Sequence, residues 1–134
     1  MILVDTGPLV AVIRTDDQNH AVCADAITFI REPMLTVWPV LAEAMYFLRF
    51  SLDAQETLWE LLETGTVRLT DLDNDDIART RYLMRKYRDL PMDLADAALV
   101  ALAERERINR IFTIDHRDFS IYKPAGMKRF EIIP

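Results

Sequence analysis

Cysteine is almost absent from this sequence, since Cys23 is the only one among 134 residues. A single cysteine cannot form an intramolecular disulfide, and no histidine or cysteine pattern surrounds Cys23 to activate it, so we interpret it as a small apolar helix residue. Long hydrophobic runs are also absent, because no stretch approaches the roughly 20 apolar residues that span a bilayer. The start of the chain shows no signal-peptide pattern. We therefore expect a cytoplasmic protein without a membrane segment.

Histidine and glycine are equally scarce, and their positions exclude several kinds of site. The two histidines, His20 and His116, are too far apart for a zinc site with ligands one helical turn apart, and no cysteine cluster replaces them. Gly7, Gly65 and Gly126 are isolated, so the sequence contains no glycine-rich phosphate-binding loop. The serine elbow of acyl-transfer enzymes is missing too. Metal chemistry through carboxylates is the kind of site that remains.

The net charge of −6 hides an uneven distribution of charge along the chain. Residues 1–76 carry 4 basic and 14 acidic side chains, whereas residues 77–134 carry 12 basic and 8 acidic ones. Several of the later basic residues lie close together, namely Arg79, Arg81, Arg85, Lys86 and Arg88, with Arg105 further on. This cluster is equally consistent with a solvated helix face and with a surface that contacts phosphate groups beside an acidic centre.

Short apolar segments alternate along the chain with longer segments of helical periodicity. The short segments are continuously apolar, which is typical of strands covered on both faces. The predicted strands are Ile2–Asp5, Met34–Val37, Val67–Thr70, Arg110–Ile114 and Arg129–Ile133. The predicted helices are His20–Glu32, Pro39–Phe50, Asp53–Thr64, Asn74–Arg88 and Asp93–Arg107. This alternation predicts one α/β domain over residues 1–134, with a mostly parallel sheet between helices.

Four acidic residues are predicted to lie at the edge of the sheet where the strands end. Asp5 ends the first strand, and Asp115 directly follows the fourth. Glu43 lies about one turn into the helix after the second strand. Asp96 lies in the first turn of its helix, whose start also faces a strand end. Because ligands of open α/β sheets bind at this edge, we expect the four acids to converge there.

Each acid also has an explanation that involves no function. Asp5 fits a turn with the Gly-Pro that follows it, Asp115 fits the start of another turn, and Glu43 fits an ordinary exposed helix position. Asp93 fits a helix N-cap, with Asp96 in the favourable first turn. As a group, however, carboxylates repel one another unless a cation lies among them. Oxygen ligands without histidine or cysteine indicate Mg²⁺ or Mn²⁺, ions that activate water for attack on a phosphodiester.

Four stretches of the sequence, in their order along the chain, resemble the motifs of PIN domains. They are ILVDTGPLVAVI at the start, PVLAEAMYFL around Glu43, LPMDLADAALVALAE around Asp96 and RIFTIDHRDF near the end. The resemblance covers nearly the whole chain and is to VapC-type toxins or their stand-alone relatives. It implies a three-layer α/β/α sandwich with a central, mostly parallel sheet. It also implies a metal-dependent endoribonuclease, the toxin of a type II toxin–antitoxin pair.

The same resemblance implies roles for individual residues. Asp5, Glu43, Asp96 and Asp115 match the four acids of PIN sites, in which the first and third bind the metal most directly. The accessory positions implied in the same way are Thr6, Asp93, Thr113 and Asp118. Relatives carry a helix beside the active-site groove, and the RNA contacts that this implies are Arg79, Arg81, Arg85 and Lys86.

The resemblance implies protein partners as well as an RNA substrate. Relatives of this kind pair as homodimers and are held inactive by a small antitoxin that inserts a segment into the groove. Tyr46 and Trp59 are candidate contact residues on the predicted helices, although core packing is the preferred explanation for both.

Two other functions fit part of the pattern. A metal-dependent phosphatase would use a strand-end aspartate such as Asp5 as its nucleophile, but its usual signature has a second aspartate where this sequence has Gly7. A non-catalytic module with the PIN fold would bind RNA or a protein partner without cleaving anything. The retained acids argue against that second alternative.

Overall fold

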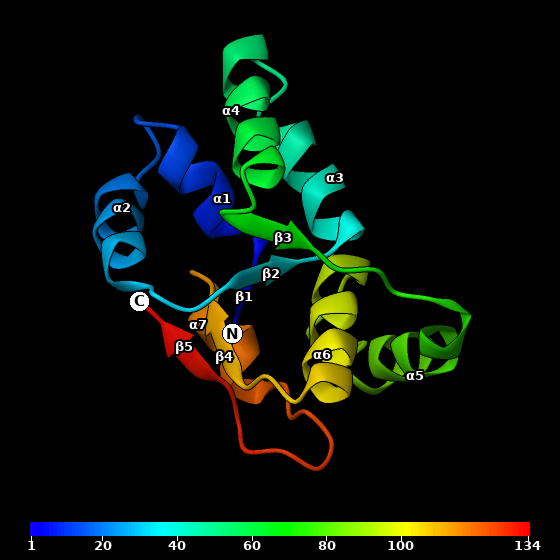
Figure 1. The fold of residues 1–134 in the computed structure, drawn as a ribbon. Helices are drawn as coiled ribbons and strands as arrows, with labels where there is room; N and C mark the ends of the chain where they lie inside the picture. The colour runs from blue at the N-terminus through cyan, green and yellow to red at the C-terminus, as the bar shows by residue number, and fades with distance from the viewer.

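The computed structural model describes all of residues 1–134, and a five-stranded sheet lies at its centre (Figure 1). The strands are β1 (Ile2–Val4), β2 (Met34–Thr36), β3 (Val67–Leu69), β4 (Arg110–Phe112) and β5 (Glu131–Ile133). They lie in the order β3-β2-β1-β4-β5, and every neighbouring pair is parallel. The carboxyl ends of β1 and β4 are therefore adjacent, and both point to the same edge of the sheet.

All five predicted strands are confirmed, each one or two residues shorter than expected. Burial on both faces, which the continuous apolar runs predicted, holds for the central strands, where Leu3 and Ile111 are fully buried. The strands at the two edges are more exposed, and Arg68 and Glu131 reach solvent there.

Seven α-helices connect and cover the strands. They are α1 (Thr6–Ile13), α2 (His20–Phe29), α3 (Trp38–Phe47), α4 (Leu52–Glu63), α5 (Ile77–Lys86), α6 (Leu94–Glu106) and α7 (His116–Ile121). The five helices predicted from periodicity are confirmed to within three residues at each end, with a short 3-10 turn, Asn74–Asp76, before α5. In Figure 1, α1, α2 and α4 lie on one side of the sheet and α6 and α7 on the other, which gives the three layers of the predicted sandwich.

Helix α1 corrects the interpretation of Asp5 and the following Gly-Pro as a turn, because Asp5 is the N-cap of this helix and Gly7 and Pro8 lie in its first turn. Pro8 is compatible with that position, since first-turn amides have no carbonyl partner within the helix. Gly7 leaves room for the side chain of Ile114, because a Cβ at position 7 would lie 2.6 Å from Cγ1 of Ile114. The helix escaped prediction because it is buried over most of its length, as at Leu9, and so lacks a continuous polar face.

Helix α7 is the second helix that the sequence did not predict. Asp115 does not open a turn, as one interpretation had it, but is the N-cap of α7, where its Oδ1 accepts a hydrogen bond from the Asp118 amide at 3.1 Å. Six residues are too few to show a helical period. The helix is held by packing of the buried Phe119 ring, edge to face, against Tyr122 and Phe130.

Helix α6 is the most deeply buried helix of the domain, with its residues from Ala97 to Ala103 almost fully buried. Its many alanines have small side chains, which allow close packing against neighbouring elements. Helix α5 packs against it on one side, and α3 contacts it on another. Although α6 is apolar, neither it nor any other helix is long and apolar enough to cross a membrane.

Two predictions about individual side chains have opposite outcomes. Cys23 is fully buried on α2, which confirms its interpretation as a small apolar helix residue. The prediction that Tyr46 and Trp59 pack in the core is wrong, because the exposed fractions of these residues are 59% and 41%. Both lie on outward-facing parts of α3 and α4, and the Tyr46 ring contacts surface neighbours, the Arg49 guanidinium and the Phe47 ring.

Candidate metal centre

The carboxyl ends of β1 and β4 open into an acidic pocket with a volume of about 400 Å³. The structure brings together there all four acids predicted to converge, Asp5, Glu43, Asp96 and Asp115. Three accessory positions line the same pocket, namely Thr6, Asp93 and Asp118. No lysine or arginine lines it, and the one ion pair made by its lining carboxylates is a long one, from the exposed Arg117 to Oδ1 of Asp118 at 3.8 Å.

Asp5 is held rigidly at the centre of the sheet edge. Its backbone amide continues the β1–β4 ladder by donating to the carbonyl of Phe112 at 3.0 Å. Its Oδ1 accepts a hydrogen bond from the Thr6 amide at 2.7 Å, as the N-cap of α1, and its Oδ2 accepts from the Thr113 hydroxyl at 2.8 Å. Burial raises the pKa of Asp5 to about 6 in spite of these bonds, and the nearby charges of Glu43 and Asp115 add to the effect.

Asp96 is placed by two hydrogen bonds from different parts of the chain. Its amide donates to Oδ1 of Asp93 at 2.8 Å, which confirms the predicted helix cap. Its own Oδ2 accepts a hydrogen bond from the hydroxyl of Tyr122 at 2.9 Å. Burial, together with repulsion from Asp5, Asp93 and Asp115, raises the pKa of Asp96 to about 8. In the metal-free protein the Asp96 carboxyl group is therefore largely protonated near neutral pH.

Asp115 and Asp118 form the third side of the pocket. The Asp115 amide donates to the Thr113 hydroxyl at 3.0 Å, so Thr113 orders both Asp5 and Asp115. Burial, and secondarily the charge of Asp115, raises the pKa of Asp118. Carboxylate oxygens of Asp96, Asp115 and Asp118 lie within 4.8 Å of one another.

The pocket fits a hard divalent cation. The three grouped carboxylates offer oxygen ligands of the kind that Mg²⁺ and Mn²⁺ prefer. Two of the buried oxygens there, Thr6 Oγ1 and Asp118 Oδ1, have no hydrogen-bond partner, which is rare for buried polar atoms. A cation among the carboxylates would offset the repulsion that contributes to the raised pKa of Asp5 and of Asp96.

Sequence reasoning missed two residues of this site. Asp17, in the loop between α1 and α2, lines the pocket, but it lies in a polar stretch typical of any surface loop. Tyr122 lies just beyond α7, and its hydroxyl bonds to Asp96 while its ring is fully buried. No sequence pattern marked either residue, because each reaches the site through the folding of a distant segment.

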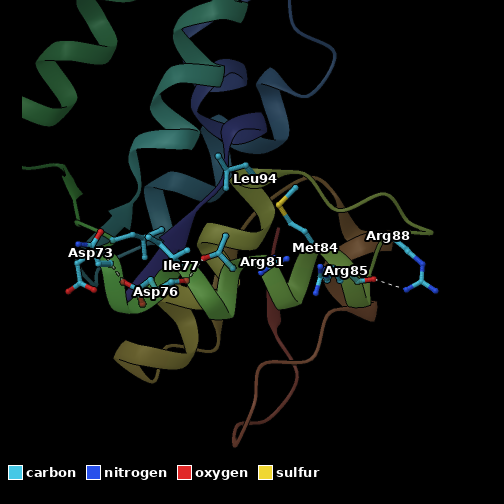
Figure 2. A pocket seen from close by; sticks show the side chains of 11 residues that line it. Asp73, Asp76, Ile77, Arg81, Met84, Arg85, Arg88 and Leu94 are labelled. Atoms are coloured by element: carbon cyan, nitrogen blue, oxygen red, sulfur yellow. Dashed lines mark hydrogen bonds between the residues drawn. The ribbon is translucent and has the colours of Figure 1, made fainter.

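The predicted RNA contacts on α5 have three different surroundings. Arg79 is engaged within the protein, where its Nε and Nη2 each donate to the Glu104 carboxylate of α6 at 2.7 Å, and this pairing raises the pKa of the guanidinium. Arg81 and Arg85 line a separate groove along α5, together with Arg88 (Figure 2). The groove has a volume of about 750 Å³.

The α5 groove is lined by positive, apolar and acidic side chains, the acidic ones being Asp73 and Asp76 just before α5. Figure 2 shows Arg81 and Arg85 on α5 and Arg88 just beyond its end, with Met84 next to Arg85 and Leu94 facing from the start of α6. Leu94 directly follows Asp93 in sequence, so this groove adjoins the acidic pocket. The fourth predicted contact, Lys86, does not line the groove and lies over the ring of Tyr87.

Known proteins resemble this chain in both sequence and fold. The family model described as PIN domain matches residues 2–123. Ribonuclease VapC26 of Mycobacterium tuberculosis (strain ATCC 25618 / H37Rv) is 31% identical over 135 residues, which cover 99% of this chain and 100% of that protein.

The similarity in fold extends over the whole chain. The crystal structure of Mycobacterium tuberculosis VapC20, described as a sarcin-ricin loop cleaving toxin, matches with a TM-score of 0.85 and 21% identity, covering 100% of both chains. A toxin–antitoxin complex from Klebsiella pneumoniae matches with a TM-score of 0.69 and 19% identity, covering 100% of this chain and 97% of the other. These likenesses agree with the three-layer fold that the sequence motifs implied.

Proposed function

Because this chain belongs to the PIN domain family, we propose that it is a metal-dependent endoribonuclease and the toxin of a type II toxin–antitoxin pair. The observation that carries the proposal is the convergence of acids from four segments in one pocket that contains no positive side chain. The full-length match to a relative named as a ribonuclease supports the same activity.

Asp5, Glu43, Asp96 and Asp115 are the residues that would hold the cation, Mg²⁺ or Mn²⁺, with Asp118 beside them. When bound, such a cation lowers the pKa of water and offsets the negative charge that develops on a phosphodiester. The chain itself fixes the orientation of the carboxylates, because the Asp5 side chain accepts two hydrogen bonds and Asp96 is restrained by Tyr122. Such preorganisation spares the site from reorganising during the reaction.

The basic side chains of the α5 groove would position the RNA strand. Arg81, Arg85 and Arg88 line a groove that adjoins the acidic pocket, and guanidinium groups bind phosphate oxygens well. Arg79 is not part of this surface, because Glu104 occupies its guanidinium.

We also propose a homodimer in the cytoplasm and an antitoxin as the protein partner. A toxin–antitoxin complex among the proteins of the same fold supports the antitoxin. The exposed aromatic residues of α3 and its neighbours offer a surface for it, at Tyr46, Phe47, Phe50 and Trp59. Phe47 also lines the acidic pocket, so a segment bound over these aromatic residues would reach the acids.

The test is cleavage of single-stranded RNA by the purified protein with Mn²⁺, with Mg²⁺ and with EDTA. Cleavage should require the cation and should fall by at least about a hundredfold in Asp5→Asn and in Asp96→Asn, because each removes a ligand charge. Asp25→Asn, at an exposed position of α2, is the matched control and should cleave normally. Cleavage that survives EDTA or either site variant would reject this mechanism.

The two alternative functions predict different results from the same protein. A non-catalytic module would show no cation-dependent cleavage while still binding RNA or a partner. A phosphatase with Asp5 as nucleophile would form a trappable phospho-aspartate, but Gly7 leaves no space for the second aspartate of that signature, since a Cβ there would contact Ile114.

A further inference from the structure

A third hollow, lined by basic residues, lies at the opposite edge of the sheet from the acidic pocket. Its volume is about 640 Å³, and its lining residues are Arg107, Asn109, Lys123, Gly126, Met127 and Lys128. Asn109 directly precedes β4, and the segment from Gly126 to Lys128 precedes β5, so the hollow faces the amino ends of these strands. In Figure 1 the loop from α7 to β5 extends away from the sheet at this end of the molecule.

The three cations of this basic hollow have no acidic partner. No carboxylate lies within 4.0 Å of the charged nitrogens of Arg107, Lys123 or Lys128. The acids on the same segments pair with other cations: Glu104 with Arg79, Glu106 with Arg105 and Glu131 with Arg110. The hollow is therefore a positive site within a chain whose net charge is −6.

The backbone around the basic hollow is held in place by specific contacts. Arg107 ends α6 in the left-handed conformation, with φ of 59°. The Lys123 amide donates to the hydroxyl of Tyr87 at 3.0 Å, and the Ala125 amide donates to Glu104 Oε1 at 3.0 Å. Gly126 has φ of 68°, and a Cβ there would lie 3.3 Å from Nη1 of Arg107. The loop is thus tied to α5 and α6, and it carries its lysines toward Arg107.

We propose that the basic hollow binds backbone phosphates of an RNA strand, as a second contact remote from the acidic pocket. Unpaired arginine and lysine side chains beside an asparagine amide match the charge and the hydrogen-bonding needs of a phosphate group. An acidic pocket repels a polyanion, so attraction elsewhere on the surface favours its binding. Asn109 and Asp115 bracket β4, so the two sites lie at opposite ends of that strand, and an RNA that contacts both must extend past the strand.

The test measures RNA affinity in EDTA, so that nothing is cleaved, by fluorescence anisotropy with a labelled single-stranded RNA at several salt concentrations. The variant of the basic hollow, called the hollow variant, is Lys123→Gln/Lys128→Gln. The control is Arg49→Gln/Arg68→Gln, which removes the same charge from the turn after α3 and from β3, on other parts of the surface. The hollow variant should bind RNA about tenfold more weakly at low salt. The magnitude of the slope of log association constant against log salt concentration should fall by about 1.4, for two lost phosphate contacts. The control should retain the wild-type slope.

Equal RNA affinities and equal salt-dependence slopes for the hollow variant and the control would overturn the proposal. A titration with inorganic phosphate, followed by NMR of the backbone amides, distinguishes a small-anion site. If phosphate shifts the amide signals of Lys123 and Lys128 while the hollow variant binds RNA normally, the basic hollow is a site for free phosphate, and the RNA proposal is wrong. Thermal melting confirms that both variants fold. The proposal rests on the proposed function only because it takes RNA as the ligand. The binding test is made without cleavage, so a loss of cleavage in Asp96→Asn does not change its result.

Discussion

The hydroxyl of Tyr122 donates a hydrogen bond to Oδ2 of Asp96 at 2.9 Å, from a ring that is completely buried. The ring packs edge to face against Tyr87 and Phe119, so the hydroxyl has little freedom to move. Asp96 approaches from the start of α6 and Tyr122 from the end of α7, and this bond joins the two helices at the acidic pocket. Tyr122 is therefore a positioning residue for a carboxylate that lines the candidate metal centre.

Tyr122→Phe should keep the fold, because the ring and its packing remain. We expect it to weaken Mn²⁺ binding by about tenfold or more, since partners that orient metal ligands have effects of this size. Calorimetric titration with Mn²⁺ measures the affinity, and the cation concentration required for half-maximal cleavage should rise with it. Tyr82→Phe, at an exposed tyrosine of α5, is the control. Unchanged Mn²⁺ affinity in Tyr122→Phe would show that the bond does not support the metal site.

Asp96→Asn should stabilise the metal-free protein near neutral pH. The pKa of Asp96 is raised from 3.8 to about 8 in the folded state, so between these values the folded protein binds more protons than the unfolded chain. Its contribution to stability therefore decreases as pH rises from about 4 to about 8. With allowance for solvent screening of this partly exposed group, we expect the variant to gain about 1–3 kcal/mol at pH 8 and almost nothing at pH 4.

Urea unfolding in EDTA at both pH values measures this difference in the free energy of unfolding. Asp25→Asn, on the exposed surface of α2, should show no comparable gain. A variant Asp96→Asn that is less stable than the parent at pH 8 would mean that the carboxylate stabilises the fold rather than straining it.

Gly7→Ala should destabilise the domain, because the added Cβ would lie 2.6 Å from Cγ1 of Ile114. We expect a loss of about 1–3 kcal/mol, as for other overpacked positions, in spite of the better helix propensity of alanine. Ile114→Ala removes the atom in conflict, so the double variant should be more stable than the sum of the two single effects. Thermal unfolding of the four proteins measures the coupling, and strict additivity would contradict the predicted clash.

Arg79→Gln and Arg81→Gln should separate stability from RNA binding on α5. Arg79→Gln leaves the largely buried Glu104 carboxylate without its ion pair, and we expect it to cost about 1–3 kcal/mol of stability. Arg81 is exposed in the groove, so Arg81→Gln should change stability by less than about 0.5 kcal/mol and should weaken RNA binding instead. Chemical unfolding and anisotropy on the same two variants check both parts. Equal losses of RNA affinity in two stable variants would assign both arginines to the RNA surface.

The sequence was informative wherever local pattern and burial agree. Apolar runs located all five strands, most clearly the central ones, where the parallel sheet is covered on both faces. Helical periodicity located the five longer helices, including the mostly buried but 13-residue α6, and it missed the eight-residue apolar α1 and the six-residue α7. The order of strands and helices was sufficient to place Asp5, Glu43, Asp96 and Asp115 at one edge, because the carboxyl ends of parallel strands share an edge.

The sequence by itself thus determined the fold class, the family and the set of acids that converge. Only the tertiary structure decided which side chains hold those acids, because each such pair joins segments that are remote along the chain. Thr113 and Asp5 are 108 residues apart, and Tyr122 and Asp96 are 26 apart. It also decided that Arg79 pairs with Glu104, whereas Arg107, Lys123 and Lys128 remain unpaired. The sequence determines which residues are charged, but packing in three dimensions determines which partner, if any, neutralises each charge.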